Sequence, residues 1–279
     1  NIPISVVRDY SIPAFVDEDS LVFATSYSGN TEETISMYKD AESRGAKIIT
    51  ITSGGKLEKS AEENSNLLVK IPSGLPPRCA LGYSFIPALV LLSRLSIIKD
   101  KTNAIDEAVS LLKKMCKDDV GLSAKKNISK EIASRIHGAF PVIYASAKHM
   151  NAVTVRWRGQ LSENAKTLSS SHVYPELNHN EIVGWREPSN ILKKFVVLTI
   201  RDKNNHPRVK ARMDITNSIL KKSGFKVMEV NSKGQSLFSR IMSLVYIGDF
   251  ASFYLSILNK IDPTPVKRID YLKKQLSRR

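Results

Sequence analysis

The residues best suited to chemistry in this sequence are the hydroxyl side chains of segment 25–31, which reads Thr-Ser-Tyr-Ser-Gly-Asn-Thr. An apolar run leads into the segment and a helical pattern follows it, which predicts a corner between a strand and a helix. Such a corner directs backbone N–H groups and the positive end of a helix dipole at one spot. We therefore predict a phosphate site with donors from Ser26, Ser28 and Thr31. Capping of the next helix would use one hydroxyl rather than several.

A cation follows two prolines at Pro76-Pro77-Arg78. The prolines restrict the backbone, so ordering Arg78 on a ligand costs little conformational entropy. Its guanidinium could hold an anionic intermediate through two parallel hydrogen bonds. An ordinary surface arginine after a turn explains the same residues equally well, and both interpretations stay open.

The densest group of polar side chains lies in segment 156–166, Arg-Trp-Arg-Gly-Gln-Leu-Ser-Glu-Asn-Ala-Lys. Helical spacing places Gln160, Glu163 and Asn164 close together on one face. A carboxylate among amides near the end of a helix suits a general base. A glutamate that forms an ordinary surface ion pair is the alternative.

Segment 174–185 is irregular and rich in titratable groups, and it contains His179. A loop of this composition beside an aromatic residue is a candidate site, although a single histidine is more often structural. His172, Glu176 and His179 have the helical spacing of metal ligands, but Pro175 argues against a helix there. We expect no metal site and no cofactor.

Strand-like and helix-like runs alternate along the chain, which predicts an α/β fold with parallel strands. The predicted strands are 21–25, 47–51, 67–71, 141–147, 195–200 and 225–230. The predicted helices are 31–44, 83–95, 104–116, 151–168, 208–222, 236–261 and 265–277. The polar segment 118–126 interrupts the pattern, so we expect two similar domains, 1–120 and 121–279, each a parallel sheet flanked by helices. Ligands should then bind beyond the carboxyl ends of the strands.

The chain has 279 residues and a formal net charge of +15 at pH 7. Residues 201–279 hold 17 lysines and arginines against 6 aspartates and glutamates. Such a charge attracts anions, including nucleic acids. The cations stand singly among apolar residues with few aromatics between them, so we favour a solvated basic face and a phosphate-seeking site over a nucleic-acid binder.

The two cysteines form neither a disulfide framework nor a metal cluster, which indicates a reducing, cytoplasmic compartment. We see no apolar run long enough to span a membrane and no secretory signal. The most apolar segment, 243–258, is interrupted by Gly248 and Asp249 and predicts a buried helix.

The Ser-Tyr-Ser-Gly-Asn-Thr corner in a duplicated α/β chain resembles the sugar isomerase (SIS) domain, a fold that binds phosphosugars. Further segments resemble one subgroup, the bifunctional phosphoglucose/phosphomannose isomerases of archaea and some bacteria. They are Pro-Pro-Arg at 76–78, Ser-Glu-Asn-Ala-Lys at 162–166, Glu-Leu-Asn-His-Asn-Glu at 176–181 and Asp-Pro-Thr-Pro-Val at 262–266. The resemblance spans essentially the whole chain. It implies a metal-independent enzyme of glycolysis or gluconeogenesis that interconverts glucose 6-phosphate and mannose 6-phosphate with fructose 6-phosphate through a cis-enediolate.

The resemblance also implies roles for single residues. Glu163 matches the base that moves a proton between C2 and C1, and Arg78 matches the cation that steadies the enediolate. His179 matches the family's ring-opening residue, which reaches the site from the other subunit of a homodimer with a shared active site. A lysine near the C-terminus completes the site, and Lys273 is the best match. The alternatives for this lysine are Lys267 and Lys274, and the phosphate cradle matches Ser26, Ser28 and Thr31.

The family begins with a further stretch that carries a Gly-Gly-Ser-Gly phosphate loop, and this sequence opens with residues that resemble those after it. We therefore expect the first domain to lack its N-terminal strand and helix. A SIS module that senses a sugar phosphate without catalysis is the main alternative function. The Glu163 and His179 segments argue against it, because a sensor needs only the hydroxyl loop. Isomerisation coupled to amine transfer ranks lower, because no glutaminase-like segment is visible.

Overall fold

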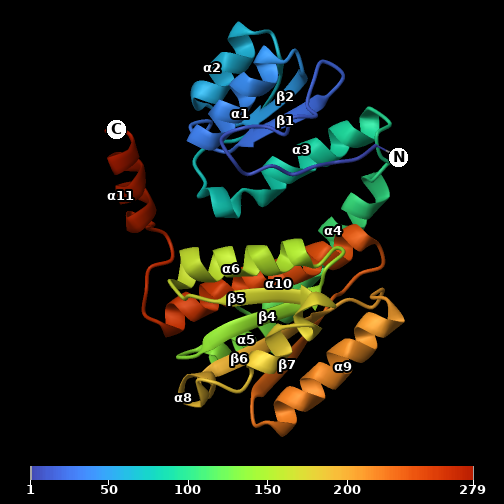
Figure 1. Cartoon of the computed structure of the whole chain (residues 1–279), viewed down its shortest axis with the longest axis vertical. Helices are drawn as coiled ribbons and strands as arrows, with labels where there is room; N and C mark the ends of the chain where they lie inside the picture. The colour runs from blue at the N-terminus through green and yellow to red at the C-terminus, as the bar shows by residue number, and fades with distance from the viewer. Residues whose placement is uncertain (1, 279) are drawn as a thin grey trace. The chain divides into compact units, whose positions relative to one another are not determined.

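The structure is a computed structural model that describes residues 2–278 (Figure 1). The chain divides into two compact units, Asn1–Thr102 and Asn103–Arg279. The division falls earlier than the predicted boundary near residue 120, because nearly all of helix α4 (Thr102–Met115) belongs to the second unit. Within that unit, the carboxylate of Glu107 on α4 accepts hydrogen bonds from the backbone N–H groups of Gln235 and Ser236.

The first unit contains a three-stranded parallel sheet with the order β1-β2-β3. Its elements are β1 (Leu21–Ser26), α1 (Glu32–Ser43), β2 (Lys47–Thr52), α2 (Gly55–Glu63), β3 (Leu67–Lys70), the 3-10 helix η1 (Pro77–Cys79) and α3 (Leu81–Arg94). The strands and helices predicted for this part of the chain are present. Helix α2 was not predicted, because only Leu57 and Ala61 of its nine residues become buried. Since the strands are parallel, the segments that follow them meet at one edge of the sheet.

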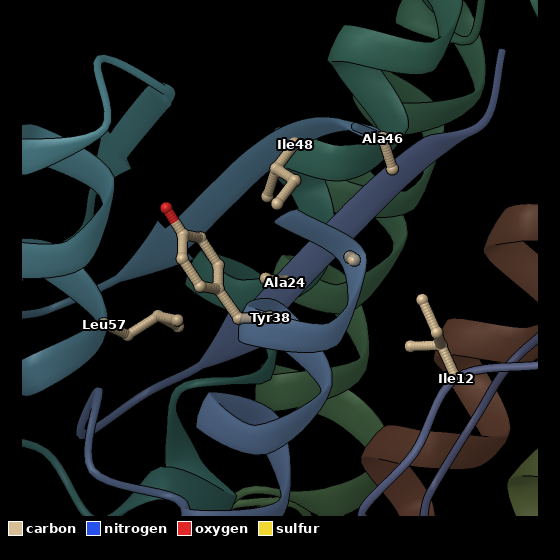
Figure 2. Packing of buried hydrophobic residues seen from close by; sticks show 7 residues of the cluster. Ile12, Ala24, Tyr38, Ala46, Ile48 and Leu57 are labelled. Carbon is tan, nitrogen blue, oxygen red and sulfur yellow. The ribbon is translucent and has the colours of Figure 1, made fainter. Parts of the chain in front are cut away.

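The core of the first unit is a small apolar cluster between strands and helices (Figure 2). Tyr38 of α1 is 1% exposed and packs with Ile48 of β2 and Leu57 of α2. Its hydroxyl donates to the carbonyl of Ser60 over 3.0 Å, so the buried polar group is satisfied. This packing holds α1 against β2 and α2.

The second unit contains a four-stranded parallel sheet with the order β5-β4-β6-β7. Its longer elements are α5 (Ile128–Ile136), β4 (Phe140–Ser146), α6 (Asn151–Ala165), β5 (Ser170–Tyr174), β6 (Phe195–Arg201), α9 (Pro207–Lys222), β7 (Lys226–Asn231), α10 (Leu237–Leu258) and α11 (Lys267–Leu276). The short helices are η2 (Cys116–Val120), η3 (Glu176–Asn178), α7 (Glu181–Gly184) and α8 (Ser189–Leu192). Two parallel sheets flanked by helices confirm the predicted fold class.

Helix α10 is the central helix of the second unit. It is long and apolar enough to cross a membrane, but 56% of its most apolar stretch is buried inside the protein. It packs against α5 and α6, as the ribbons of these helices show (Figure 1). At the contact with α6, the indole Nε1 of Trp157 donates to the carbonyl of Leu244 over 2.9 Å. The prediction of a buried helix in this segment is therefore confirmed.

Candidate active site

The loop between β1 and α1 holds its hydroxyl groups in one place. The hydroxyls of Ser26 and Thr31 lie 2.8 Å apart, and the backbone N–H of Gly29 donates to the Ser26 hydroxyl over 3.1 Å. Ser26 is 5% exposed, whereas Ser28 and Thr31 are exposed. Thr31 stands at the start of α1 without a side-chain capping hydrogen bond. The loop is therefore built on Ser26 and presents the hydroxyls of Ser28 and Thr31 to a ligand.

A second turn, between β2 and α2, supports this loop from the side. Gly29 has φ of +65°, and a Cβ on it would lie 1.6 Å from the carbonyl oxygen of Gly54. The backbone N–H of Leu57 donates to the Gly29 carbonyl over 2.9 Å. The side-chain oxygen of Asn30 accepts from the backbone N–H of Lys56 over 3.1 Å. The first turns of two helices are thus locked together around the hydroxyl loop.

Arg78 lies in η1, which follows the third strand at the same edge of the sheet. The hydroxyl of Tyr27, inside the hydroxyl loop, accepts a hydrogen bond from the backbone N–H of Leu75 over 2.9 Å. This contact ties the loop to the segment that leads into Pro76-Pro77-Arg78. Arg78 itself is half-buried. The structure therefore places the predicted cation on the same edge as the predicted phosphate cradle.

Glu163 lies in the last turn of α6, in the second unit, and is half-buried. Its neighbours Gln160 and Asn164 are buried at 4% and 8% exposure, and the amide of Asn164 donates to the Ser252 hydroxyl of α10 over 2.9 Å. The amides thus face α10, with Glu163 at the margin of that face. This end of α6 is well supported, which suits a carboxylate that must be held in one orientation.

The end of α6 is also joined to the segment that precedes α11. Lys166 has a left-handed backbone that ends the helix, and its ammonium group donates to the carbonyls of Glu163 and Pro263, the latter over 3.2 Å. The two hydrogen bonds of Thr264 lower the pKa of the Asp262 carboxyl, and the charge of Lys166 adds to this effect. The motif segments at 162–166 and 262–266 therefore meet. Lys267, Lys273 and Lys274 lie on α11, which begins directly after this junction, and all three are exposed.

His179 ends the short helix η3 after β5 and is exposed. Its neighbours hold the segment on both sides. The amide of Asn178 donates to the hydroxyl of Thr216 over 2.9 Å. The carboxylate of Glu181 accepts from the hydroxyl of Tyr144 over 2.5 Å.

Tyr144 is fully buried on β4, and its hydroxyl also accepts from the indole N–H of Trp185 over 2.8 Å. Burial raises the pKa of Tyr144, and the Glu181 carboxylate adds to this effect. Sequence reasoning missed this network, because Tyr144 sits in an ordinary apolar strand. The signal for it in the sequence is Glu181, the acid that ends the motif segment 176–181 around His179.

Glu163 and His179 lie at opposite edges of the sheet in the second unit. Strands β4 and β5 are parallel, so α6, which connects them, runs back from the carboxyl edge of the sheet to the amino edge. Figure 1 shows α6 alongside these strands. Glu163 is in the last turn of this 15-residue helix, which is about 22 Å long at 1.5 Å per residue. His179 follows the carboxyl end of β5, so the two side chains of one chain cannot meet at one substrate.

Among residues 2–278, no three His, Cys, Asp or Glu side chains are grouped so that they could hold a metal ion. His172 lies in β5, while Glu176 and His179 lie in the turn after it, so the helical spacing of these three residues is not realised. Both cysteines carry free thiols.

Comparisons with known proteins match both units. Residues 8–108 match the SIS domain family, and residues 125–276 match the family described as the bacterial phospho-glucose isomerase C-terminal SIS domain. The chain is 45% identical over 279 residues to the bifunctional phosphoglucose/phosphomannose isomerase of Caldicellulosiruptor bescii, with 99% of this chain and 82% of the relative covered. A protein of the same name from Aquifex aeolicus is 40% identical over 278 residues, with 100% and 82% covered.

Among solved structures, a glucose-6-phosphate isomerase like protein from Thermus thermophilus has a TM-score of 0.62 to this chain. It is 16% identical and covers 87% of this chain and 75% of its own. At that identity the match supports the fold alone. The relatives at 40% identity and above span both units and every motif segment described above, and the chain belongs to the family of bifunctional phosphoglucose/phosphomannose isomerases.

Proposed function

We propose that this protein is an aldose–ketose isomerase that interconverts glucose 6-phosphate and mannose 6-phosphate with fructose 6-phosphate. Membership of the family carries the proposal, and the hydroxyl loop supports it. Ser28 and Thr31 would donate to the phosphate, with Ser26 beneath them, because neither exposed hydroxyl is used to cap α1. The alternative, a sensor without catalysis, does not explain why the Glu163 and His179 segments are held so firmly.

Glu163 is the proposed base. It removes the C2 proton of the open-chain aldose, and the electron pair moves to the carbonyl oxygen on C1, which gives a cis-enediolate. The proton of the O2 hydroxyl then passes to the oxygen on C1. Return of the proton to C1 gives the ketose. The guanidinium of Arg78 stabilises the negative charge of the intermediate, which is the kind of interaction that usually contributes most to catalysis. Rotation of the intermediate about C2–C3 lets one base serve both C2 epimers.

His179 is the proposed ring-opening residue, and it would act in the site of a second copy. The separation of Glu163 and His179 within one chain supports this assignment, because one substrate cannot reach both. The active site would then be shared between the subunits of a homodimer. Lys273 is the proposed C-terminal lysine, with Lys267 and Lys274 as alternatives on the same helix. The reaction needs no metal in this scheme, and a cytoplasmic location is proposed with it.

The test is the conversion of fructose 6-phosphate by the protein in the presence of a chelator, with glucose 6-phosphate and mannose 6-phosphate measured separately. Formation of both is expected. Glu163→Gln should lower kcat by about 10²–10⁴-fold while fructose 6-phosphate still binds, because it removes the base and leaves the phosphate cradle intact.

Ser162→Ala is the matched control, since Ser162 is the exposed neighbour of Glu163 on α6, and it should leave kcat nearly unchanged. If Glu163→Gln kept most of the turnover, Glu163 would not be the base. Binding of fructose 6-phosphate without any product from the unaltered protein would favour the sensor instead.

A further inference from the structure

A cavity of about 210 Å³ opens at the carboxyl ends of β6 and β7 in the second unit. Its lining residues are Arg201, Asp202, Lys203, Lys210, Asn231 and Ser232. Arg201 and Asn231 are paired residues at the ends of the two strands. Ligands of open parallel α/β sheets bind beyond this edge. None of the lining residues belongs to the isomerase site proposed above.

The one carboxylate in the cavity wall is already neutralised. Asp202 accepts a hydrogen bond from Nε of Arg240 over 2.6 Å and another from the hydroxyl of Ser232 over 2.8 Å. The side chains of Arg240 and Asp202 are only 5% and 4% exposed, so this is a buried ion pair. Arg201 is likewise paired, with Asp214 and with Glu229. The lysines are therefore the charged side chains of the wall that form no ion pair among the described residues.

The two lysines are held by neutral acceptors. The ammonium group of Lys210 donates to the carbonyl of Lys203 over 2.6 Å, and that of Lys203 donates to the side-chain oxygen of Gln235 over 2.5 Å. Within residues 2–278, neither ammonium group forms an ion pair with a carboxylate. Each ammonium group has three protons, so both retain donors for a ligand. The cavity thus combines two ammonium groups that pair with no carboxylate and a concave wall.

We propose that this cavity is a second phosphate-binding site, for the phosphate dianion of inorganic phosphate or of a small phosphorylated metabolite. Two ammonium groups match the charge of the dianion, and hydrogen bonds between charged groups are about twice as strong as neutral ones. The volume is below the roughly 300 Å³ at which pockets for drug-sized ligands begin, which favours one phosphate group over a nucleotide. The site lies in the second unit, shares no residue with the cradle at residues 26–31 and does not depend on the isomerase activity.

The experiment measures the binding of inorganic phosphate by isothermal titration calorimetry at low salt. It uses a variant whose cradle has lost its exposed hydroxyls through Ser28→Ala and Thr31→Ala. One remaining site per chain is expected. Adding Lys203→Gln and Lys210→Gln should weaken this binding at least about tenfold, because both charges of the cavity are lost. The matched control adds Lys221→Gln and Lys222→Gln, which remove the same charge at the far end of α9.

The control should bind phosphate as before, since it changes the net charge of the protein but not the cavity. Absence of phosphate binding in the cradle variant, or equal weakening by both lysine pairs, would overturn the proposal. A parallel titration with fructose 6-phosphate separates the two sources of the ligand. Tighter binding than inorganic phosphate identifies a sugar phosphate as the ligand, and equal binding identifies free phosphate; both outcomes support the site. Thermal unfolding of each variant verifies that it is folded.

Discussion

At the scale of single residues, Gly29 sets the geometry of the hydroxyl loop that we propose as the phosphate cradle. Its φ of +65° and the 1.6 Å separation of a built Cβ from the Gly54 carbonyl oxygen leave no room for a side chain. We expect Gly29→Ala to destabilise the protein by about 3 kcal/mol, because strain and overpacking add. Sugar-phosphate binding should weaken as well. Chemical denaturation measures the first effect and calorimetry the second.

Gly74 provides the control for strain alone. It also has a positive φ, +92°, but a Cβ there would meet nothing within 4 Å. Gly74→Ala should therefore cost only about 1–2 kcal/mol and leave ligand binding intact. Equal losses in the two variants would show that the contact between Gly29 and Gly54 does not matter.

Glu107 gives a prediction for pH. Its carboxylate accepts from the backbone N–H groups of Gln235 and Ser236 and from the hydroxyl of Ser239. These hydrogen bonds, above all the one from Gln235, lower the pKa of Glu107 to about 2. Because the pKa is lower in the folded state, the stabilisation is complete above the ordinary value of 4.5 and is lost as the pH falls towards 2.

The measurement compares the urea midpoints of the unaltered protein and of Glu107→Gln from pH 7 to pH 2. The variant should be less stable by about 1 kcal/mol at pH 7, a figure reduced for the solvent that screens this group. The difference should narrow below about pH 5 and nearly vanish near pH 2. A difference that stays constant with pH would show that the ionised carboxylate does not anchor α4.

The sequence predicts which residues form the hydroxyl loop, but not the contacts that each of them makes. A run of hydroxyl residues between a strand and a helix predicts an anion site from local chemistry alone. That Ser26 is buried under the loop and that Tyr27 reaches Leu75 depends on the neighbouring strand ends. Such contacts follow from the assembled sheet, which local composition does not encode.

At the scale of elements, the close approach of α6 and α10 depends on a glycine. A Cβ on Gly248 would lie 2.2 Å from Nε1 of Trp157, a side chain only 2% exposed. Replacing glycine by alanine inside a helix stabilises the helix by about 1 kcal/mol, but overpacking a filled core costs about 1–3 kcal/mol. We expect Gly248→Ala to destabilise the protein on balance, and thermal unfolding measures it.

Gly159 is the matched control on the partner helix, because a Cβ there would meet nothing within 4 Å. Gly159→Ala should stabilise the protein by up to about 1 kcal/mol through helix propensity alone. The opposite signs of the two substitutions are the expected result. If both substitutions stabilise the protein, the two helices are not packed as tightly as described.

Two physical causes explain why β5, α2 and α5 escaped prediction. Strand β5 reads Ser-Ser-His-Val-Tyr, and only Tyr174 of its residues is fully buried, because β5 lies at the edge of the sheet. Helix α2 is polar and short, and α5 follows directly on the polar segment taken as the domain boundary. Hydrophobic periodicity finds elements that bury a continuous face. Strand β5 and helix α2 bury no such face. Helix α5 does bury one, formed by Ser129, Ile132, Ala133 and Ile136, but the polar segment before it concealed its start.

At the scale of the whole molecule, the separation of Glu163 and His179 supports the proposal that two chains make an active site. The two residues lie at opposite ends of the crossover unit formed by β4, α6 and β5. A protein in which one chain supplies the base and another supplies the ring-opening residue has no complete site as a monomer. Sequence spacing does not distinguish a shared site from an unshared one, because fifteen residues between the two positions allow either arrangement until the direction of α6 is known.

Two mixed dimers give opposite results for shared and unshared sites. In the first, one chain carries Glu163→Gln and the other His179→Ala; in the second, an unaltered chain is paired with a chain that carries both substitutions. With shared sites, the first dimer has one complete site and should keep about half of the unaltered activity, while neither site of the second is complete. If each chain builds its own site, the second dimer keeps about half and the first is inactive. Purifying both through two different affinity tags and measuring fructose 6-phosphate conversion decides between these arrangements, because the two dimers contain the same substitutions in the same number.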